Sequence, residues 1–222
     1  MALSPGLVFA VTVDTSEPVA FAFTALALLG WARRRWLFAG LFMTAACLTK
    51  EPLLLLPVGL GMWEAVTWWR NKSPGPDLIR RLAALSIGPV IFLGWYLYLR
   101  STFGVWPFVQ ETKDYFAIPF VGWWNSMRSA ATLAAGPFDP NQVGNAALPL
   151  LTVSAAALTV GLVRSVRLRS FIQPIFIVMA LLILSLNSVG VLYPKDLLRE
   201  TAITMLLLPA AIAGRRESRG PP

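Results

Sequence analysis

The feature that most constrains this chain is a succession of long apolar runs separated by short clusters of arginine and lysine. Hydrophobic residues make up 56% of the 222 residues, and only 14% are charged. The mean hydropathy of +0.64 lies well outside the range of an ordinary soluble domain. Apolar runs with so few internal charges are typical of helices that cross a membrane. We therefore predict an all-α fold, a polytopic transmembrane helical bundle embedded in a lipid bilayer.

Seven apolar segments are long enough to be spans or near-spans, and an N-terminal half-helix precedes them at 3–13. The predicted spans are 18–32, 36–49, 52–70, 79–100, 145–164, 170–188 and 197–213. The first two are shorter than the roughly 20 residues of an untilted span, so they would borrow flanking residues or thin the bilayer. This division predicts a transmembrane domain over 1–214 and a short basic tail over 215–222.

The basic residues predict the orientation of the bundle. If the spans alternate, 13 of the 19 basic residues fall on one side, which the positive-inside rule makes cytoplasmic. They are Arg33, Arg34 and Arg35, then Arg70, Lys72, Arg80 and Arg81, then Arg164, Arg167 and Arg169, and finally Arg215, Arg216 and Arg219. The C-terminus is then cytoplasmic, and we expect the protein in a plasma membrane of bacterial type. Confinement of the charge to these short loops also argues against a nucleic-acid partner, despite the net charge of +8.

The acids fall mostly on the opposite, outer side. Eight of the 11 acids lie there, namely Asp14, Glu17, Glu51, Glu111, Asp114, Asp139, Asp196 and Glu200. The positive-inside rule does not account for acids, so their asymmetry indicates a functional surface on the outer side. Because the chain has no histidine, acid–base chemistry there would rest on carboxylates, lysine or tyrosine.

The outer side also carries the one long loop, 101–144. Its stretch "FGVWPFVQETKDYFAIPFVGWWNSM" is too aromatic for a disordered segment. We expect short interfacial helices around 120–134, lying on the membrane. Trp106, Trp123 and Trp124 would anchor this loop at the membrane surface or cover a groove.

Three predicted helix starts on the outer side carry charged residues. "TSEP" at 15–18 recurs as "TKEP" at 49–52, and "YPKDLLRE" follows at 193–200. In the first two, a Ser or Thr N-cap, a Glu in the first turn and a Pro explain the residue types as helix caps. In the third, Arg199 and Glu200 fall just inside a predicted span, where charges are functional candidates.

A shared site for a phosphorylated lipid would explain the three helix starts together. Helix N-termini offer unpaired N–H groups and a positive dipole end to phosphate, and basic side chains add charged donors. We assign substrate or phosphate binding to Lys50, Glu51, Lys195 and Arg199. The candidate catalytic residues are Asp14 and Glu17, as a general base or as ligands of a divalent metal. The alternative is a set of ordinary caps and interfacial ion pairs.

The run "LSPGLVFAVTVDTSEPVAFAFTALALLGWARRRWLFAGLFMTAACLTKEPLLLLPV" resembles the membrane glycosyltransferases of the C superfamily, above all the bacterial mannosyltransferase-like members. The resembling features are Pro5, the acidic turn 14–18, the arginines 33–35 and the "TKE" turn 49–51. "FGVWPF" at 103–108 and Arg199 are also similar. The resemblance covers about the first 70 residues and the remainder loosely.

The resemblance implies transfer of a hexose such as mannose from a polyprenyl-phosphate carrier. The acceptor would be a lipid, glycan or protein at the outer face. In this family the base is an aspartate in the first outer loop, and no segment here matches that loop. We therefore expect the chain to be the C-terminal part of a member, beginning near the third or fourth helix. Asp14 and Glu17 would then support the metal or sugar, and Glu17 would be the base only if that aspartate is not required.

Two other functions stay open at this point. A transporter or permease subunit would use charged residues at membrane depth as a substrate path, and Glu64 is the main charge within a predicted span. No inverted repeat is evident to support this function. A non-catalytic membrane protein would use the outer charges for stability alone.

Overall fold

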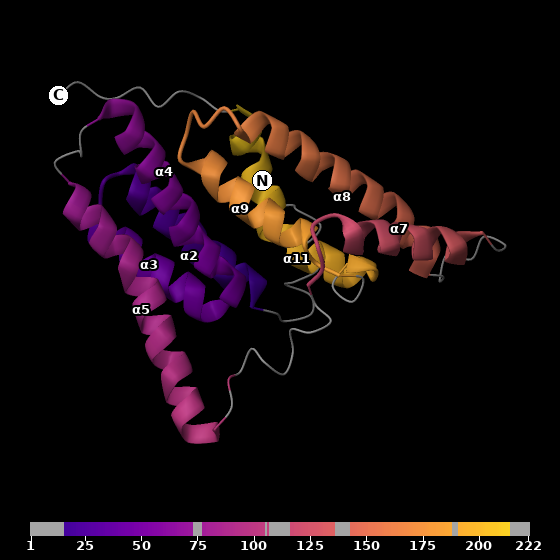
Figure 1. The fold of residues 1–222 in the computed structure, drawn as a ribbon, viewed down its shortest axis with the longest axis horizontal. Coiled ribbons are helices and arrows are strands. Elements are labelled where there is room, and N and C mark those ends of the chain that lie inside the picture. The colour runs from indigo at the N-terminus through magenta and orange to yellow at the C-terminus, as the bar shows by residue number, and fades with distance from the viewer. Residues whose placement is uncertain are drawn as a thin grey trace.

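The computed structural model describes residues 16–72, 77–104, 106, 116–135, 143–187 and 191–213, and in these ranges it consists of helices joined by turns (Figure 1). An isolated bridge pairs Phe116 with Leu186. The elements are α2 (Glu17–Ala32), α3 (Trp36–Thr49), the 3-10 helix η1 (Glu51–Leu54), α4 (Leu55–Asn71), α5 (Leu78–Phe103), α7 (Val121–Ala134), α8 (Val143–Ser165), α9 (Ile172–Leu184) and α11 (Pro194–Ala213). The predicted all-α class is therefore confirmed. Each of the seven predicted segments contains a helix, but the bundle of seven membrane spans is not confirmed and stays a prediction. The expected half-helix at 3–13 and the tail at 215–222 lie outside the described residues.

The first half of the chain forms a group in which α3 packs against both α2 and α5. The arginine cluster forms the turn between α2 and α3, where Arg34 adopts a left-handed conformation with φ of 58°. Small residues allow α2 and α3 to approach closely. A Cβ placed on Gly30 would lie 2.7 Å from the ring of Phe38.

The second half of the chain packs α7 against α8, and α8 and α9 against α11. The start of α7 lies directly on the chain that follows α9, because a Cβ on Gly122 would meet the carbonyl oxygen of Leu186. The indole Nε1 of Trp123 donates a hydrogen bond of 2.8 Å to the carbonyl of Ile183. Trp123 is thus a core residue, so the prediction of surface anchoring is wrong for it, whereas Trp124 is exposed.

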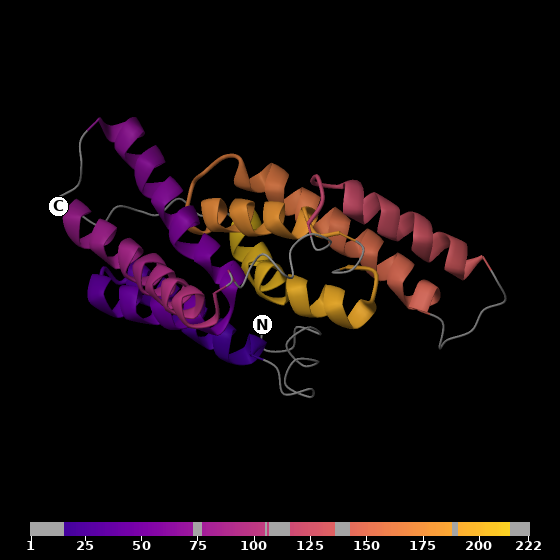
Figure 2. The same cartoon turned by 60° about the horizontal axis from the view of Figure 1, so that its bottom comes forward.

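The two groups meet where α4 packs on α9, and α11 also touches α2 (Figures 1 and 2). Gly59 of α4 forms the closest approach, since a Cβ there would lie 2.5 Å from the Cα of Ile175. Segments far apart in the sequence are therefore brought together across this contact.

The C-terminal end of α3 is tied to the next element through the single cysteine. Cys47 is buried, and its Sγ donates to the carbonyl oxygen of Leu53 in η1 at 3.4 Å. This contact closes the sharp turn between α3 and α4.

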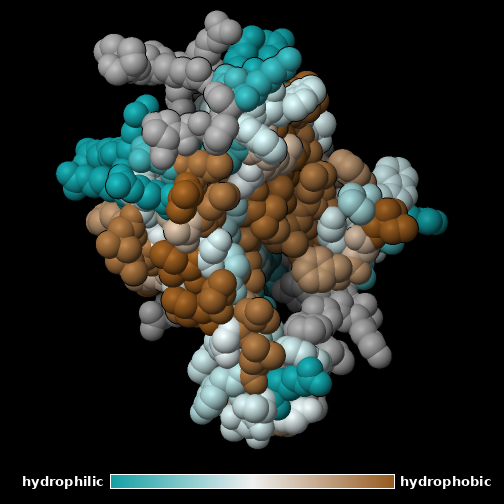
Figure 3. Space-filling model, turned by 60° about the vertical axis from the view of Figure 1, so that its left-hand side comes forward, coloured by the Kyte–Doolittle hydropathy of each residue, from teal (hydrophilic) through white to brown (hydrophobic). Residues whose placement is uncertain are grey.

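Apolar side chains cover much of the outer surface of the helices. Figure 3 shows them gathered across the middle of one face, with hydrophilic side chains above. Two described helices, α5 and the 146–165 part of α8, are long and apolar enough to cross a membrane. In the most apolar 18-residue stretch of each helix, only 22% (α5) and 28% (α8) is buried inside the protein. The end of α5 projects beyond the other helices (Figure 1).

Candidate functional site

Four charged side chains from three separate elements form one ion-pair cluster. Glu17 begins α2, Lys50 joins α3 to η1, and Arg199 and Glu200 lie in the first turns of α11. The Nζ of Lys50 lies 2.9 Å from Glu17 Oε1 and 3.6 Å from Glu200 Oε2. Arg199 lies 3.5 Å from Glu17 through Nε and 3.3 Å from Glu200 through Nη2. Each cation therefore contacts both carboxylates.

The cluster is shielded from solvent and electrically balanced. The side-chain exposures of Glu17, Glu200, Lys50 and Arg199 are 4%, 13%, 16% and 34%. Two positive and two negative charges cancel, and Asp196 approaches Arg199 at 4.0 Å from the rim. Charges this poorly hydrated are stable because each has an opposite charge in contact.

The local structure explains how the two similar sequence motifs place their charges, and corrects the helix-cap prediction. Pro18 occupies the first turn of α2, but the side chain of Ser16 makes no capping hydrogen bond. Thr49 does not begin a helix, because it is the last residue of α3 and its hydroxyl donates to the carbonyl of Ala45 at 2.7 Å. Lys50 has extended backbone, with φ of −149° and ψ of 118°. It thereby leaves the axis of α3 and reaches Glu17.

The structure separates the remaining predicted site residues from the cluster. Glu51 accepts a short hydrogen bond from the hydroxyl of Tyr96 in α5. Lys195 is exposed and makes no ion pair with the described residues. Asp14 lies outside the described residues. The structure therefore brings together three of the predicted residues, Glu17, Lys50 and Arg199.

A small apolar pocket of about 70 Å³ opens beside the cluster. Lys50 and Glu200 line it on the charged side, whereas Glu17 and Arg199 are not among its lining residues. Its wall includes Phe116, apolar side chains of α9 and α11 such as Ile183, and the buried Thr204. The Thr204 hydroxyl makes no hydrogen bond with the described residues. The pocket thus offers an apolar wall, one unpaired hydroxyl and a charged rim.

Metal binding finds no support in the part of the chain that the structure describes. Within it, no group of three or more His, Cys, Asp or Glu side chains is arranged to hold a metal ion. Glu17 and Glu200 are occupied by Lys50 and Arg199 instead.

Three residues of this region were not assigned to the site from the sequence. The sequence marks Glu200 as a charge at membrane depth but does not predict its contact with Lys50. Thr204 follows Glu200 by four residues and so shares its helix face, which is a signal that the sequence does contain. Tyr96 carries no such signal, because its contact with Glu51 spans 45 residues.

Comparisons of the chain with models of protein families, with curated proteins and with solved structures found no match.

Proposed function

We propose that the chain is a polytopic membrane protein whose charged cluster binds the phosphate of a polyprenyl-phosphate-linked sugar at the outer membrane face. It would act as a membrane glycosyltransferase, or as the C-terminal part of one. The observation that carries this proposal is the convergence of Lys50 and Arg199 from distant segments on Glu17, with Lys50 also lining an apolar pocket. A phosphorylated lipid has matching chemistry, with an anionic head and an apolar chain.

The exposure of α5 and α8 supports placement in a membrane. A core helix of a soluble protein is mostly buried. In these two helices, less than a third of the most apolar 18-residue stretch is buried. Val90, Leu93 and Phe103 of α5 are among the exposed residues. Contiguous apolar surface of this kind is rare on soluble monomers, and it is favourable against lipid chains.

The positions of the charges support the proposed orientation. The cluster lies at the start of α2, and the arginine turn lies at its end. A helix of 16 residues is about 24 Å long, so the two charged regions are separated by most of the thickness of a bilayer core. The arginine end would face the cytoplasm under the positive-inside rule.

In this proposal, phosphate exchanges for a carboxylate that now contacts the cations. Glu200 lines the pocket and is the carboxylate that a ligand would displace from Lys50, while Glu17 stays behind the cations and orients them. Lys50 and Arg199 would then stabilise the negative charge that grows on the phosphate as the sugar–phosphate bond breaks. Glu200 is better placed than Glu17 to accept a proton from the sugar acceptor.

The charge balance of the cluster favours one other candidate function, a non-catalytic membrane protein. In that case the ion pairs would only hold the outer ends of α2, α3 and α11 together. A transport path is less well supported, because Glu64 is paired with Arg81 at 2.6 Å.

Binding of decaprenyl phosphate to the purified chain in a neutral detergent tests the proposal. Loss of a charged hydrogen bond is worth about 1.5–3 kcal/mol, so Lys50→Gln and Arg199→Gln should each weaken binding about 10- to 100-fold. Lys195→Gln is the matched control, since it removes one exposed positive charge from the same helix end as Arg199. Equal binding by all three variants, or no binding by the unaltered chain, would refute the phosphate site.

Transfer of radiolabelled mannose from polyprenyl-phosphate mannose tests the enzymatic part separately. The proposal expects Glu200→Gln to lower transfer with decaprenyl phosphate binding retained. Binding without transfer in the unaltered chain would leave the phosphate site standing and refute catalysis by this chain alone.

A further inference from the structure

A second and larger cavity lies at the arginine end of the bundle. Its volume is about 450 Å³, within the usual range of small-molecule sites. It is open to solvent on one side and is lined by the α2–α3 turn, the last turns of α4, the start of α5 and the chain before α9. It lies about the length of α2 from the outer cluster, so the two regions are separate sites.

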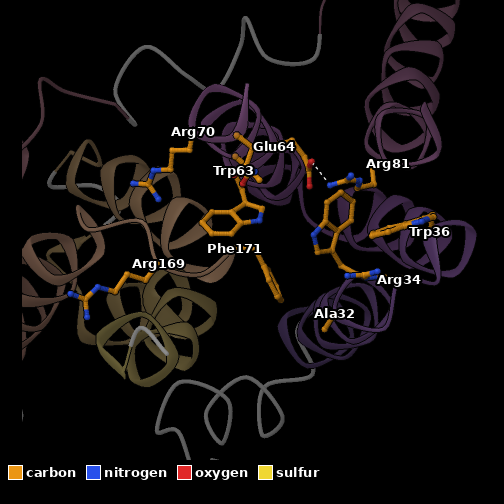
Figure 4. Close-up of a pocket in the computed structure, with 12 residues that line it drawn as sticks. Ala32, Arg34, Trp36, Trp63, Glu64, Arg70, Arg81, Arg169 and Phe171 are labelled. Atoms are coloured by element: carbon orange, nitrogen blue, oxygen red, sulfur yellow. Dashed lines mark hydrogen bonds and ion pairs between the residues drawn. The ribbon is translucent and has the colours of Figure 1, made fainter. Parts of the chain in front are cut away.

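The lining of this cavity is strongly basic. Four arginines and one glutamate contribute to it, so the charge of the described lining is +3. The charged lining residues are Arg34, Arg70, Arg81, Arg169 and Glu64. Figure 4 shows Arg70 and Arg169 on one side of the cavity and Arg34 with Arg81 on the other, with Trp63 and Phe171 between them.

Two of these arginines are held in place by neighbouring groups. Arg70 donates from Nη1 to the carbonyl of Leu168 at 2.8 Å. Arg81 pairs with Glu64 and lies over the ring of Trp36 at 5.7 Å. The Nε of Arg81 is buried and makes no hydrogen bond with the described residues. Guanidinium groups held in this way are suited to a ligand that carries negative charge.

Membrane orientation alone does not account for this arrangement. The positive-inside rule is satisfied by lysine or arginine anywhere in the short loops. Here, all but one of the 13 basic residues on the predicted inner side are arginine. Four of them, from three different loops, line one cavity, namely Arg34, Arg70, Arg81 and Arg169. Arginine differs from lysine in its planar fork, which binds phosphate oxygens in pairs. The indole and phenyl rings in the wall add apolar surface beside the charge.

We propose that this cavity binds a phosphate ester, which would be the headgroup of an anionic phospholipid of the inner leaflet or a soluble phosphate ester. Arg70 and Arg169 would contact the phosphate from one side, and Arg34 and Arg81 from the other. Trp63 and Phe171 would pack against the glycerol part of the ester. Basic pockets between membrane helices on the cytoplasmic side bind anionic headgroups in this way.

Native mass spectrometry of the full chain in a neutral detergent tests this proposal with phosphatidylglycerol as the probe and phosphatidylcholine as the reference lipid. The Arg70→Gln/Arg169→Gln variant should weaken the phosphatidylglycerol adduct at least 10-fold. The matched control is Arg33→Gln/Arg164→Gln, which removes the same charge from neighbouring positions that do not line the cavity and should change the adduct less than 3-fold. Equal losses in the two variants would overturn the proposal in favour of diffuse electrostatic attraction.

A lysine variant and a competition measurement complete the experiment. Arg70→Lys/Arg169→Lys keeps the charge and the membrane orientation, and it should still weaken the adduct about 3- to 10-fold because the paired contacts are lost. If it binds as well as the unaltered chain, the arginine site is refuted. Glycerol 3-phosphate that displaces the lipid at millimolar concentration would identify a soluble ester as the source, and lipid binding without such displacement would identify the headgroup. The loss caused by Arg70→Gln/Arg169→Gln should be equally large when Lys50→Gln is also present, which separates this site from the outer one.

Discussion

Replacing Glu17 by glutamine should destabilise the protein by an amount that the geometry of the cluster sets. The change removes the contacts at 2.9 Å to Lys50 and at 3.5 Å to Arg199, and it leaves the cluster with a charge of +1. Breaking a buried ion pair by removing one partner costs about 3–5 kcal/mol. Both cations keep Glu200, at 3.6 Å and 3.3 Å, so we expect a smaller loss than this, about 2–3 kcal/mol.

The measurement is thermal unfolding in detergent micelles, followed by far-ultraviolet circular dichroism at one scan rate. For a chain of this size, 2–3 kcal/mol corresponds to a fall in Tm of roughly 5–10 °C. Asp77→Asn is the control, because the Asp77–Arg80 pair is largely exposed and is worth at most about 1 kcal/mol. Glu17→Gln combined with Lys50→Gln restores neutrality and should recover about 1 kcal/mol of the loss.

A fall in Tm no larger than that of Asp77→Asn would refute the argument from burial. A double variant less stable than the Glu17→Gln single variant would refute the argument from charge balance.

Two other substitutions test the packing that brings the cluster together. Gly59→Ala should cost about 1–3 kcal/mol, because its Cβ meets the backbone of Ile175, whereas Gly61→Ala has open space and should be neutral or stabilising. Equal Tm values for these two variants would contradict the close contact of α4 with α9. Tyr96→Phe removes a hydrogen bond to the exposed carboxylate of Glu51 and should lower the stability by about 1 kcal/mol, or 2–4 °C in Tm. An unchanged Tm would show that this bond contributes nothing to stability.

The sequence predicted the helices because their ends carry local signals. The arginines at 33–35 interrupt two apolar runs, and α2 and α3 end and begin within a residue or two of the predicted limits. The packing of helices depends on residues far apart in the chain and could not be predicted in the same way. The apposition of Gly59 and Ile175 across 116 residues illustrates this.

The candidate site was predictable in part for a similar reason. Topology places Glu17, Lys50 and Arg199 at one end of the bundle, and they do meet there. The contact of Glu51 with α5 was not predictable, because it depends on the extended backbone at Lys50. Successive side chains on extended backbone point in opposite directions, so neighbours in the sequence reach different helices.

The buried thiol of Cys47 gives the ion-pair cluster of Glu17, Lys50, Arg199 and Glu200 a kinetic reporter of its own. It is the one cysteine in the chain, and it lies three residues before Lys50 in the sequence. Its Sγ donates a hydrogen bond to the carbonyl of Leu53 in η1. A maleimide can reach it only when the end of α3 parts from η1, so the labelling rate measures how often this corner opens. A molecule that bridges Lys50 and Arg199 would hold the corner shut, and its occupancy could be followed by the slowing of that single alkylation.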